Sequence, residues 1–304
     1  MASRPNITRR QHHVWQKYLA SWATNGTVVC LNADRVFSTG TRDLAVEVDF
    51  YKIKALADSD MRHIAWLISK ANPTAQKYHR DYIDRLLMPL QLGQQLSPTK
   101  AIAQKLDYYA TQALENHHTR IENSFAPILS EIRDQQSLDF YADDSKAAIF
   151  FNYLSTQYMR TKGIKERSSA LPGVPALKFD IGRIWNVIVP ILASNIAASL
   201  FCERHQRELT IVRNKTNLPF ITGDQPAVNL ALGTSNGRPP EKLIIYYPVS
   251  PNLALILGEV NESSDYTQHE IGVEQVEALN RRIYNARHRQ VFASSALPLR
   301  PFVP

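Results

Sequence analysis

Cysteine is scarce in this chain, which has only Cys30 and Cys202 among its 304 residues. Two cysteines so far apart provide neither a disulfide framework nor the paired thiols of a structural zinc site. The sequence also lacks a P-loop, a Gly-x-Gly-x-x-Gly turn, a Gly-x-Ser-x-Gly elbow and a His-Glu-x-x-His helix. These absences argue against Walker-type nucleotide hydrolysis, Rossmann cofactors and serine esterase chemistry.

Residues 1–13 are polar and basic and do not contain the apolar run of a secretory signal peptide. Residues 184–202 carry no charge over 19 positions, which approaches the length that spans a membrane. The same stretch contains Asn186, Pro190 and Asn195, which fit a buried core helix better than lipid. We therefore expect a soluble, cytoplasmic protein with no membrane partner.

The overall composition is that of a soluble globular protein, with 44% hydrophobic and 21% charged residues. The formal net charge is +7, and such an excess of basic residues favours a polyanionic partner without establishing one. The candidate partners are a nucleic acid or another protein, and the oligomeric state is left open.

Hydrophobic periodicity divides the chain into a helical middle and two β-rich ends. Helices are predicted over 61–70, 74–87, 97–133, 145–162 and 179–202, with a loop at 90–96. A short amphipathic helix is predicted over 11–22, and another helix over 273–286. Strands are predicted in a hairpin at 27–38, in hairpins at 209–222 and 243–257, and at 290–293, and residues 45–53 are a candidate continuation of the sheet.

These elements predict an α+β fold with an antiparallel sheet built from the C-terminal third of the chain. We expect the N-terminal hairpin to join that sheet. A single domain is predicted over residues 11–296. It is preceded by a basic arm at 1–10, followed by a tail at 297–304, and interrupted only by a proline-containing linker at 171–175.

The stretch Leu218–Leu230 organises the candidate site. Phe220–Thr222 favours a strand, which breaks at Gly223–Pro226 because proline cannot donate to a ladder. Asp224 is therefore placed where a buried strand leaves its sheet. The carboxylate is either functional or a cap on its own turn.

Helical spacing nominates a second group of polar side chains. Glu115, His118 and Glu122 stand at i, i+3 and i+7, so they share one helical face. Glu-x-x-His is half of a di-iron signature, but the sequence has no second copy, and a polar face is the alternative. Arg160 lies on an apolar helix, where it pairs with Glu122 or Asp224 or holds a phosphate.

Histidine and arginine at the two ends of the chain suggest anion binding. His12 and His13, at the predicted helix start, titrate near neutral pH and are preceded by Arg9 and Arg10. Both histidines also have an ordinary structural interpretation. After Glu277 no acidic residue occurs, whereas five arginines do, and these form either a nucleic-acid surface or a solvated basic face: Arg281, Arg282, Arg287, Arg289 and Arg300.

Short motifs in a fixed order resemble a known family. The chain has Gln11-His12, Tyr18-Leu19, Phe50-Tyr51, Glu115 and Glu122, the run at 157–161, the block at 220–226, the turn at 248–251, and Asn280. Together, over about residues 10–295, they resemble the bacterial domain-of-unknown-function family 4238. The resemblance implies no established activity; it nominates residues.

Three functions follow as hypotheses. The first is a nuclease-like phosphodiesterase, an effector of bacterial defence or of a toxin system, with a divalent metal as a candidate cofactor. Its predicted catalytic residues are His12, His13, Glu122, Arg160 and Asp224. We predict that four of them share one pocket between the helices and the C-terminal sheet: His12, Glu122, Arg160 and Asp224. The second is a non-catalytic module that binds nucleic acid through Arg9, Arg10 and the C-terminal arginines, or that binds a protein. The third is a structural subunit.

Overall fold

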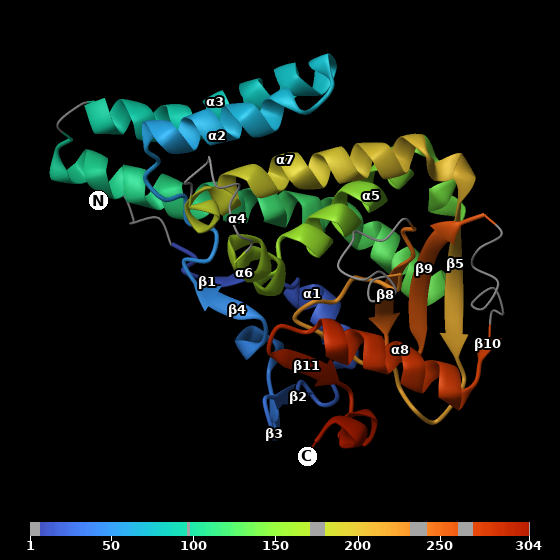
Figure 1. Cartoon of the computed structure of the whole chain (residues 1–304). Helices are drawn as coiled ribbons and strands as arrows, with labels where there is room; N and C mark the ends of the chain where they lie inside the picture. The colour runs from blue at the N-terminus through green and yellow to red at the C-terminus, as the bar shows by residue number, and fades with distance from the viewer. Residues whose placement is uncertain (1–6, 96–97, 171–179, 232–241, 261–269, 304) are drawn as a thin grey trace.

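The computed structural model describes residues 7–95, 98–170, 180–231, 242–260 and 270–303. Over these residues the fold is α+β, as the sequence predicts, with helices in the middle and strands toward both ends of the chain (Figure 1). The predicted linker at 171–175 and most of the basic arm lie outside the described residues.

The helical middle begins at Asp58 and ends at Cys202. Its helices are α2 (Asp58–Ser69), α3 (Pro73–Gln95), α4 (Lys100–Ser130), α5 (Asp144–Met159), α6 (Lys162–Ala170) and α7 (Ile181–Cys202). Thr99, Asp143 and Asp180 cap α4, α5 and α7, because each side chain accepts a hydrogen bond from the backbone N–H three residues later. One π-helical turn, Glu131–Gln135, extends α4.

The predicted loop at 90–96 is wrong, because α3 continues through Pro89 to Gln95. A proline inside a helix removes one backbone hydrogen bond. The helix continues because its flanks pack: Leu86 and Leu87 are buried, and Gly93 lies against Leu106 of α4. A Cβ on Gly93 would come within 2.2 Å of Leu106 Cδ1, so the two helices approach closely at that point.

Among the described helices, α7 alone is long and apolar enough to cross a membrane. About half of its most apolar window, 56%, is buried inside the protein. The helix packs along α5 and forms one side of the helical layer (Figure 1). This burial is consistent with the core helix that the sequence predicts.

Within the described residues the strands form three sheets. The largest has the order β10-β5-β9-β8-β7 and is antiparallel except between β10 and β5. Its strands are β5 (Arg207–Asn214), β7 (Val228–Asn229), β8 (Ile245–Ser250), β9 (Leu253–Glu259) and β10 (Glu270–Ile271). The predicted hairpin at 243–257 is confirmed as β8 and β9.

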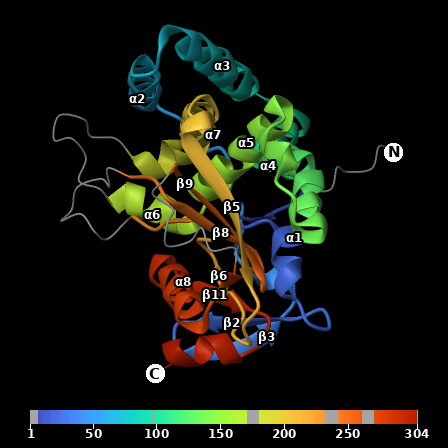
Figure 2. The same cartoon turned by 90° about the vertical axis from the view of Figure 1, so that its right-hand side faces the viewer.

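Both faces of this sheet are covered, which explains its nearly continuous apolar strands. Leu253, Leu255 and Leu257 belong to the core shared with α4 and α5. The alternating residues Ala254 and Ile256 belong to the core shared with α8 (Val273–Ala286). The sheet therefore lies between the helical middle and α8 (Figure 2).

The second sheet joins the two ends of the chain in the order β3-β2-β11-β6. Its strands are β2 (Val28–Asn32), β3 (Arg35–Thr39), β6 (Thr222–Gly223) and β11 (Gln290–Ala293). The prediction that the N-terminal hairpin joins C-terminal strands is confirmed.

The predicted hairpin of 209–212 with 218–222 is wrong, because β5 pairs with β9 and β10. Residues 218–221 instead find their partners in loops and side chains. The Phe220 N–H donates to Pro251 O (2.8 Å), and the Ile221 N–H donates to Asn280 Oδ1 (2.9 Å). Only Thr222 and Gly223 are left to pair as a strand, with β11.

The N-terminus also differs from its prediction. Residues 10–12 form β1 (Arg10–His12), which pairs with β4 (Val46–Val48) in a separate small sheet, and α1 covers only Gln16–Leu19 before a 3-10 turn at Ala20–Trp22. Residues 45–53 thus do not continue the larger sheets. The Gln11 side chain explains the strand, because it bonds to Thr111 O (2.8 Å) and accepts from the Tyr51 N–H (2.6 Å).

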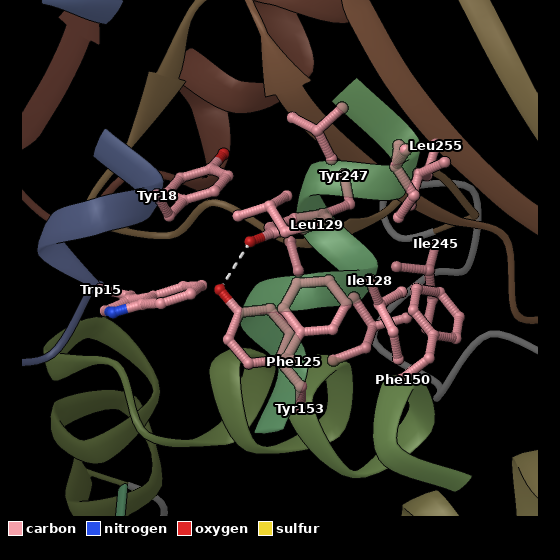
Figure 3. Close-up of a cluster of buried hydrophobic side chains, with 14 of the residues drawn as sticks. Trp15, Tyr18, Phe125, Ile128, Leu129, Phe150, Tyr153, Ile245, Tyr247 and Leu255 are labelled. Atoms are coloured by element: carbon pink, nitrogen blue, oxygen red, sulfur yellow. Dashed lines mark hydrogen bonds between the residues drawn. The ribbon is translucent and has the colours of Figure 1, made fainter. Parts of the chain in front are cut away.

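Aromatic packing places α1 against the middle of the molecule (Figure 3). Tyr18 stacks on Tyr247 of β8 with ring centroids 5.1 Å apart, and Phe125 stacks on Tyr153 at 3.9 Å. The Tyr153 and Tyr247 hydroxyls are hydrogen bonded at 2.9 Å. Since aromatic pairs add stabilisation beyond their buried area, this cluster fixes the position of α1 relative to α4 and α5.

Candidate active site

A cavity of about 420 Å³ lies where α1 and the turn before it meet α4 and the end of α5. It combines four charged side chains with hydroxyl, amide and imidazole groups. Its lining residues are His12, Trp15, Gln16, Lys17, Ala20, Thr41, Glu115, His118, Thr119, Glu122 and Arg160.

Arg160 and Glu122 form a buried ion pair in the wall of this cavity. Arg160 Nη2 lies 2.6 Å from Glu122 Oε1 and 2.7 Å from Gln157 Oε1, and the Arg160 side chain is only 2% exposed. Burial raises the pKa of Glu122, although the charge of Arg160 opposes that shift. The pair that the sequence predicts as one alternative for Arg160 is therefore present, with Glu122 as the partner.

Glu115 lies two helical turns before Glu122 on α4 and faces the same cavity. Burial, assisted by the negative charge of Glu122, raises the pKa of Glu115 to about 7. A carboxyl group that titrates near neutral pH exchanges protons readily under physiological conditions. Glu115 is thus the lining residue best suited to act as an acid or a base.

Three nitrogen atoms of the lining residues are buried without a hydrogen-bond partner in the part of the chain that the structure describes. They are His12 Nε2, His118 Nδ1 and Arg160 Nε. Burial lowers the pKa of both His12 and His118, so both rings are neutral at pH 7. Because an unpaired buried polar atom costs free energy, these nitrogens indicate a site with unused hydrogen-bonding capacity.

Strained backbone supports the strand that carries His12. Ala45 (φ 47°) and Asp49 (φ 54°) flank β4 in the left-handed conformation, which costs a residue other than glycine about 1–2 kcal/mol. Ala45 is held there because its carbonyl accepts from the His13 N–H (2.9 Å) and its N–H donates to Gln290 Oε1 (3.1 Å). The C-terminal strand β11 thus helps to position the small sheet beside the cavity.

His13 was predicted to be catalytic with His12, but it lies in the core outside the lining of the cavity. Its ring packs against Phe50 with centroids 5.3 Å apart, and burial lowers its pKa to about 3. Its backbone carbonyl accepts a hydrogen bond from Gln157 Nε2 (3.0 Å). His13 therefore helps to orient Gln157, whose Oε1 accepts a hydrogen bond from Arg160.

Asp224, predicted to share the pocket, also lies outside its lining. The carboxylate accepts three backbone hydrogen bonds, from the N–H groups of His288 (2.8 Å), Arg289 (2.7 Å) and Gln290 (2.9 Å). Burial raises the pKa of Asp224, and these hydrogen bonds oppose the shift. One alternative from the sequence is that Asp224 caps its own turn. The side chain does cap a turn, but it is the turn at residues 288–290, which follows α8.

Hydrogen bonds join several of the motif residues into one buried network around the cavity. The Tyr51 hydroxyl donates to the backbone carbonyl of His12 (3.0 Å). The Thr161 hydroxyl donates to Gln225 Oε1, which connects the end of α5 to the block at 220–226. Motifs that are far apart in the sequence are therefore in contact.

The sequence model of a protein family described as "Protein of unknown function (DUF4238)" matches residues 10–173 and 188–296. The chain belongs to this family. The resemblance predicted from the ordered motifs is confirmed. No curated protein and no solved structure matches the chain. Since the family description names no activity, the function of this DUF4238 protein is argued from its site.

The N-terminal arginines of this family member are engaged in ion pairs. Arg9 contacts Asp49 (2.6 Å) and Asp107 (3.0 Å), and Arg10 contacts Asp43 (2.5 Å). Their charges are therefore already matched by carboxylates. The predicted phosphate contacts of Arg9 and Arg10 would have to replace these ion pairs.

The C-terminal arginines differ among themselves. Arg287 lies over the Tyr284 ring, with its Cζ 3.5 Å from the centroid, and donates to Tyr284 O (2.6 Å). Arg281, Arg282 and Arg289 are exposed. Of these, Arg281 and Arg289 are available at the surface for a polyanion, and none of the three lines the candidate active site.

No group of three or more His, Cys, Asp or Glu side chains is placed to hold a metal ion within the residues that the structure describes. Glu115, His118 and Glu122 do share one helical face, as their spacing predicts, and all three line the cavity. The described residues therefore offer no such ligand set for the divalent metal that the sequence suggests as a candidate cofactor.

Six lining residues are not indicated as site residues by any sequence pattern: Trp15, Gln16, Lys17, Ala20, Thr41 and Thr119. Lys17 lies on the exposed side of α1, and Thr41 comes from a 3-10 turn that accepts a hydrogen bond from Gln16 Nε2 (3.1 Å). Trp15 is 7% exposed and also belongs to the hydrophobic core. No local pattern identifies Thr41, since its place in the site depends on the pairing of β1 with β4.

Proposed function

We propose that this DUF4238 protein hydrolyses phosphodiesters, with the cavity around Glu115, Glu122 and Arg160 as its active site. The observation that supports the proposal is a carboxyl group with a pKa of about 7 in one pocket with a buried guanidinium. Phosphoryl transfer needs a group that moves a proton and fixed positive charge that stabilises the transition state.

Each group has a defined role in the reaction. Glu115, in its carboxylate form, removes a proton from the attacking water. The oxygen of that water forms a bond to phosphorus while the bond to the leaving oxygen breaks, and solvent at the open rim protonates the leaving group. Arg160 and Lys17 stabilise the charge on the phosphoryl oxygens, and Glu122 keeps Arg160 oriented through their 2.6 Å contact.

The size of the cavity sets the scale of the substrate. A volume of about 420 Å³ is within the range of small-molecule pockets and accommodates one nucleotide unit. Because Arg9 and Arg10 are paired with carboxylates, an extended track for a long phosphate backbone is not preformed beside it. We therefore favour a substrate that presents a single flexible phosphodiester, such as a nucleotide dimer or a single-stranded end.

In a cell, a nuclease of this kind in the cytoplasm would act as an effector, for example in bacterial defence or in a toxin system. Induced expression of the wild-type chain should then slow growth. The inactive variant described below should not slow growth at equal abundance.

The direct test is hydrolysis of bis(p-nitrophenyl) phosphate and of short single-stranded RNA and DNA, with and without added Mg²⁺. Glu115→Gln should lower the rate by about 10²–10⁴-fold, since it removes the proton-transfer group but keeps the shape. Glu277→Gln, an exposed substitution on α8, is the matched control and should retain the wild-type rate. Absence of hydrolysis by the wild-type chain under all these conditions, or full activity in Glu115→Gln, would contradict the proposal.

A non-catalytic binding function has one specific observation in its favour. Within the described residues His118 Nδ1 is buried without a hydrogen-bond partner, and burial keeps the His118 ring neutral by lowering its pKa, which suits ligand binding without proton transfer. Calorimetry with uridine monophosphate and adenosine monophosphate separates the two functions. Binding of a monophosphate, without turnover of any phosphodiester substrate, would favour the binding module.

A further inference from the structure

We propose that a second cavity, between α3 and α7, binds an uncharged planar heterocycle of nucleoside size. The cavity has a volume of about 680 Å³, larger than the candidate active site, and α4 and α5 complete its walls. The two cavities have no lining residue in common. The proposal does not depend on the phosphodiesterase activity.

One wall of this cavity consists of ring side chains. Tyr78, His79 and Tyr82 of α3 line it together with His117 of α4. The rings of Tyr82 and His117 have centroids 6.0 Å apart. Tyr78 is 73% exposed, whereas His79 is only 7% exposed, so the ring side chains include both accessible and buried ones. Several rings in one lining favour a flat ligand that packs against them.

Helices α5 and α7 supply neutral hydrogen-bonding groups to the lining. These groups belong to Asn152, Thr156, Ser194 and Asn195. His79 Nε2 lies 2.8 Å from Asn195 Oδ1, which orients this amide and leaves its NH₂ group to donate to a ligand. A ligand edge that carries carbonyl and N–H groups matches such a lining.

Charge excludes an ionised ligand. The lining of this cavity contains no Asp, Glu, Lys or Arg, and all of its residues are described. Burial, together with the charges of Arg120 and Arg160, lowers the pKa of His117 to about 4, so its ring is neutral at pH 7. An ionised group would therefore lose its hydration without gaining a counter-charge. The candidate active site, with Lys17, Glu115, Glu122 and Arg160, has the opposite character.

Unused hydrogen-bonding capacity adds to the case for a ligand. The Tyr82 hydroxyl is buried and has no hydrogen-bond partner in the described part of the chain. Such a group costs free energy in the empty protein, and a ligand atom that reached it would offset that cost. A heterocycle that carries both donors and acceptors, as a nucleobase or nucleoside does, fits the rings, the amides and the neutrality together.

Isothermal titration of the full chain with adenosine, guanosine, uridine and cytidine at neutral pH tests the inference. At least one nucleoside should bind, and it should bind more tightly than its 5′-monophosphate. Ala198→Phe places a ring in the cavity from an exposed position and should weaken that binding tenfold or more. Ala278→Phe, on the exposed side of α8, is the matched control and should bind like the wild type.

A second variant protects the test against an unforeseen change of fold. Asn195→Leu keeps the volume but removes the amide, and it should weaken binding while the chain retains its cooperative unfolding transition. The inference is overturned if no nucleoside binds, if Ala198→Phe binds like Ala278→Phe, or if a monophosphate whose binding Ala198→Phe weakens binds more tightly than its nucleoside. Monophosphate binding that Ala198→Phe leaves unchanged belongs to the candidate active site.

Discussion

At the scale of single residues, the environment of Glu115 makes the stability of the protein depend on pH. Its pKa is raised from 4.5 to about 7 in the folded protein. Folding therefore favours its protonated form. Stability that is fully present below about pH 4.5 is lost as the pH rises through about 7. After allowance for partial exposure, the loss is on the order of 1 to 3 kcal/mol.

Urea unfolding at pH 5 and at pH 8.5 measures this effect. The wild-type chain and Glu277→Gln should lose more free energy of unfolding between the two pH values than Glu115→Gln does. Other groups titrate in the same range, so the difference between variants carries the result. An equal loss in all three proteins would show that Glu115 has an ordinary pKa.

Asp224 presents a different case, a carboxylate that accepts three backbone hydrogen bonds outside the lining of the cavity. Asp224→Asn replaces one acceptor oxygen by an NH₂ group, which then faces the N–H groups of residues 288–290. Each buried N–H left unpaired costs about 1–3 kcal/mol, so the variant should lose at least that much stability. Thermal unfolding measures the loss. A variant that unfolds like the wild type but has lost activity would instead make Asp224 a functional residue.

The same residues show what the sequence can predict at this scale. The spacing of Glu115, His118 and Glu122 places them on one face because a helix is a local structure with a known period. The partners of Asp224 lie 64 to 66 residues away, across a strand pairing that no local pattern encodes. The nearby Pro226 marks the turn, but it does not say which backbone the carboxylate caps.

At the scale of elements, α1 shows how a four-residue helix is held by tertiary contacts. So short a helix has little stability of its own. The Tyr18 hydroxyl is buried and bonds to Thr222 Oγ1 (2.7 Å) and Pro248 O (2.6 Å), which fastens α1 to the C-terminal strands. Tyr18→Phe should therefore cost about 1–3 kcal/mol, because it leaves these partners buried and unpaired.

Urea denaturation of Tyr18→Phe, with the exposed substitution Tyr78→Phe as control, tests this dependence. Unfolding midpoints that fall equally in both variants would mean that the hydroxyl of Tyr18 is not what anchors α1.

Periodicity predicts the long elements well and the short ones poorly. Helices α4, α5 and α7 and the β8–β9 hairpin have enough residues for a hydrophobic pattern to emerge. β1, β4 and β6 have two or three residues each, and distant contacts hold the backbone beside them, such as those of Gln11 with Tyr51 and of Asn280 with Ile221. The candidate cavity lies beside such short elements, which is why the sequence identified part of its lining and missed Lys17 and Thr41.

At the scale of the whole molecule, the net charge of +7 is unevenly available. Arg9 and Arg10 are neutralised by Asp49, Asp107 and Asp43, whereas Arg281 and Arg289 are exposed near the C-terminus. These surface pairs stabilise the fold only slightly, but their carboxylates repel an approaching phosphate, which reduces the gain from Arg9 and Arg10. Binding to nucleic acid should therefore depend on the C-terminal arginines rather than on the basic arm.

Fluorescence anisotropy with labelled single-stranded RNA and DNA, titrated from low to moderate salt, tests this distribution. Binding should be weak. It should weaken further as salt is added, because contacts with phosphates release bound counterions and that release is less favourable at high salt. Arg281→Gln combined with Arg289→Gln should lower the slope of log K against log salt by about two, since each lost phosphate contact removes about one. Arg9→Gln combined with Arg10→Gln should leave the slope nearly unchanged. No binding even at low salt would remove nucleic acid as a partner, and equal effects of the two pairs would show that the basic arm exchanges its carboxylates for phosphate.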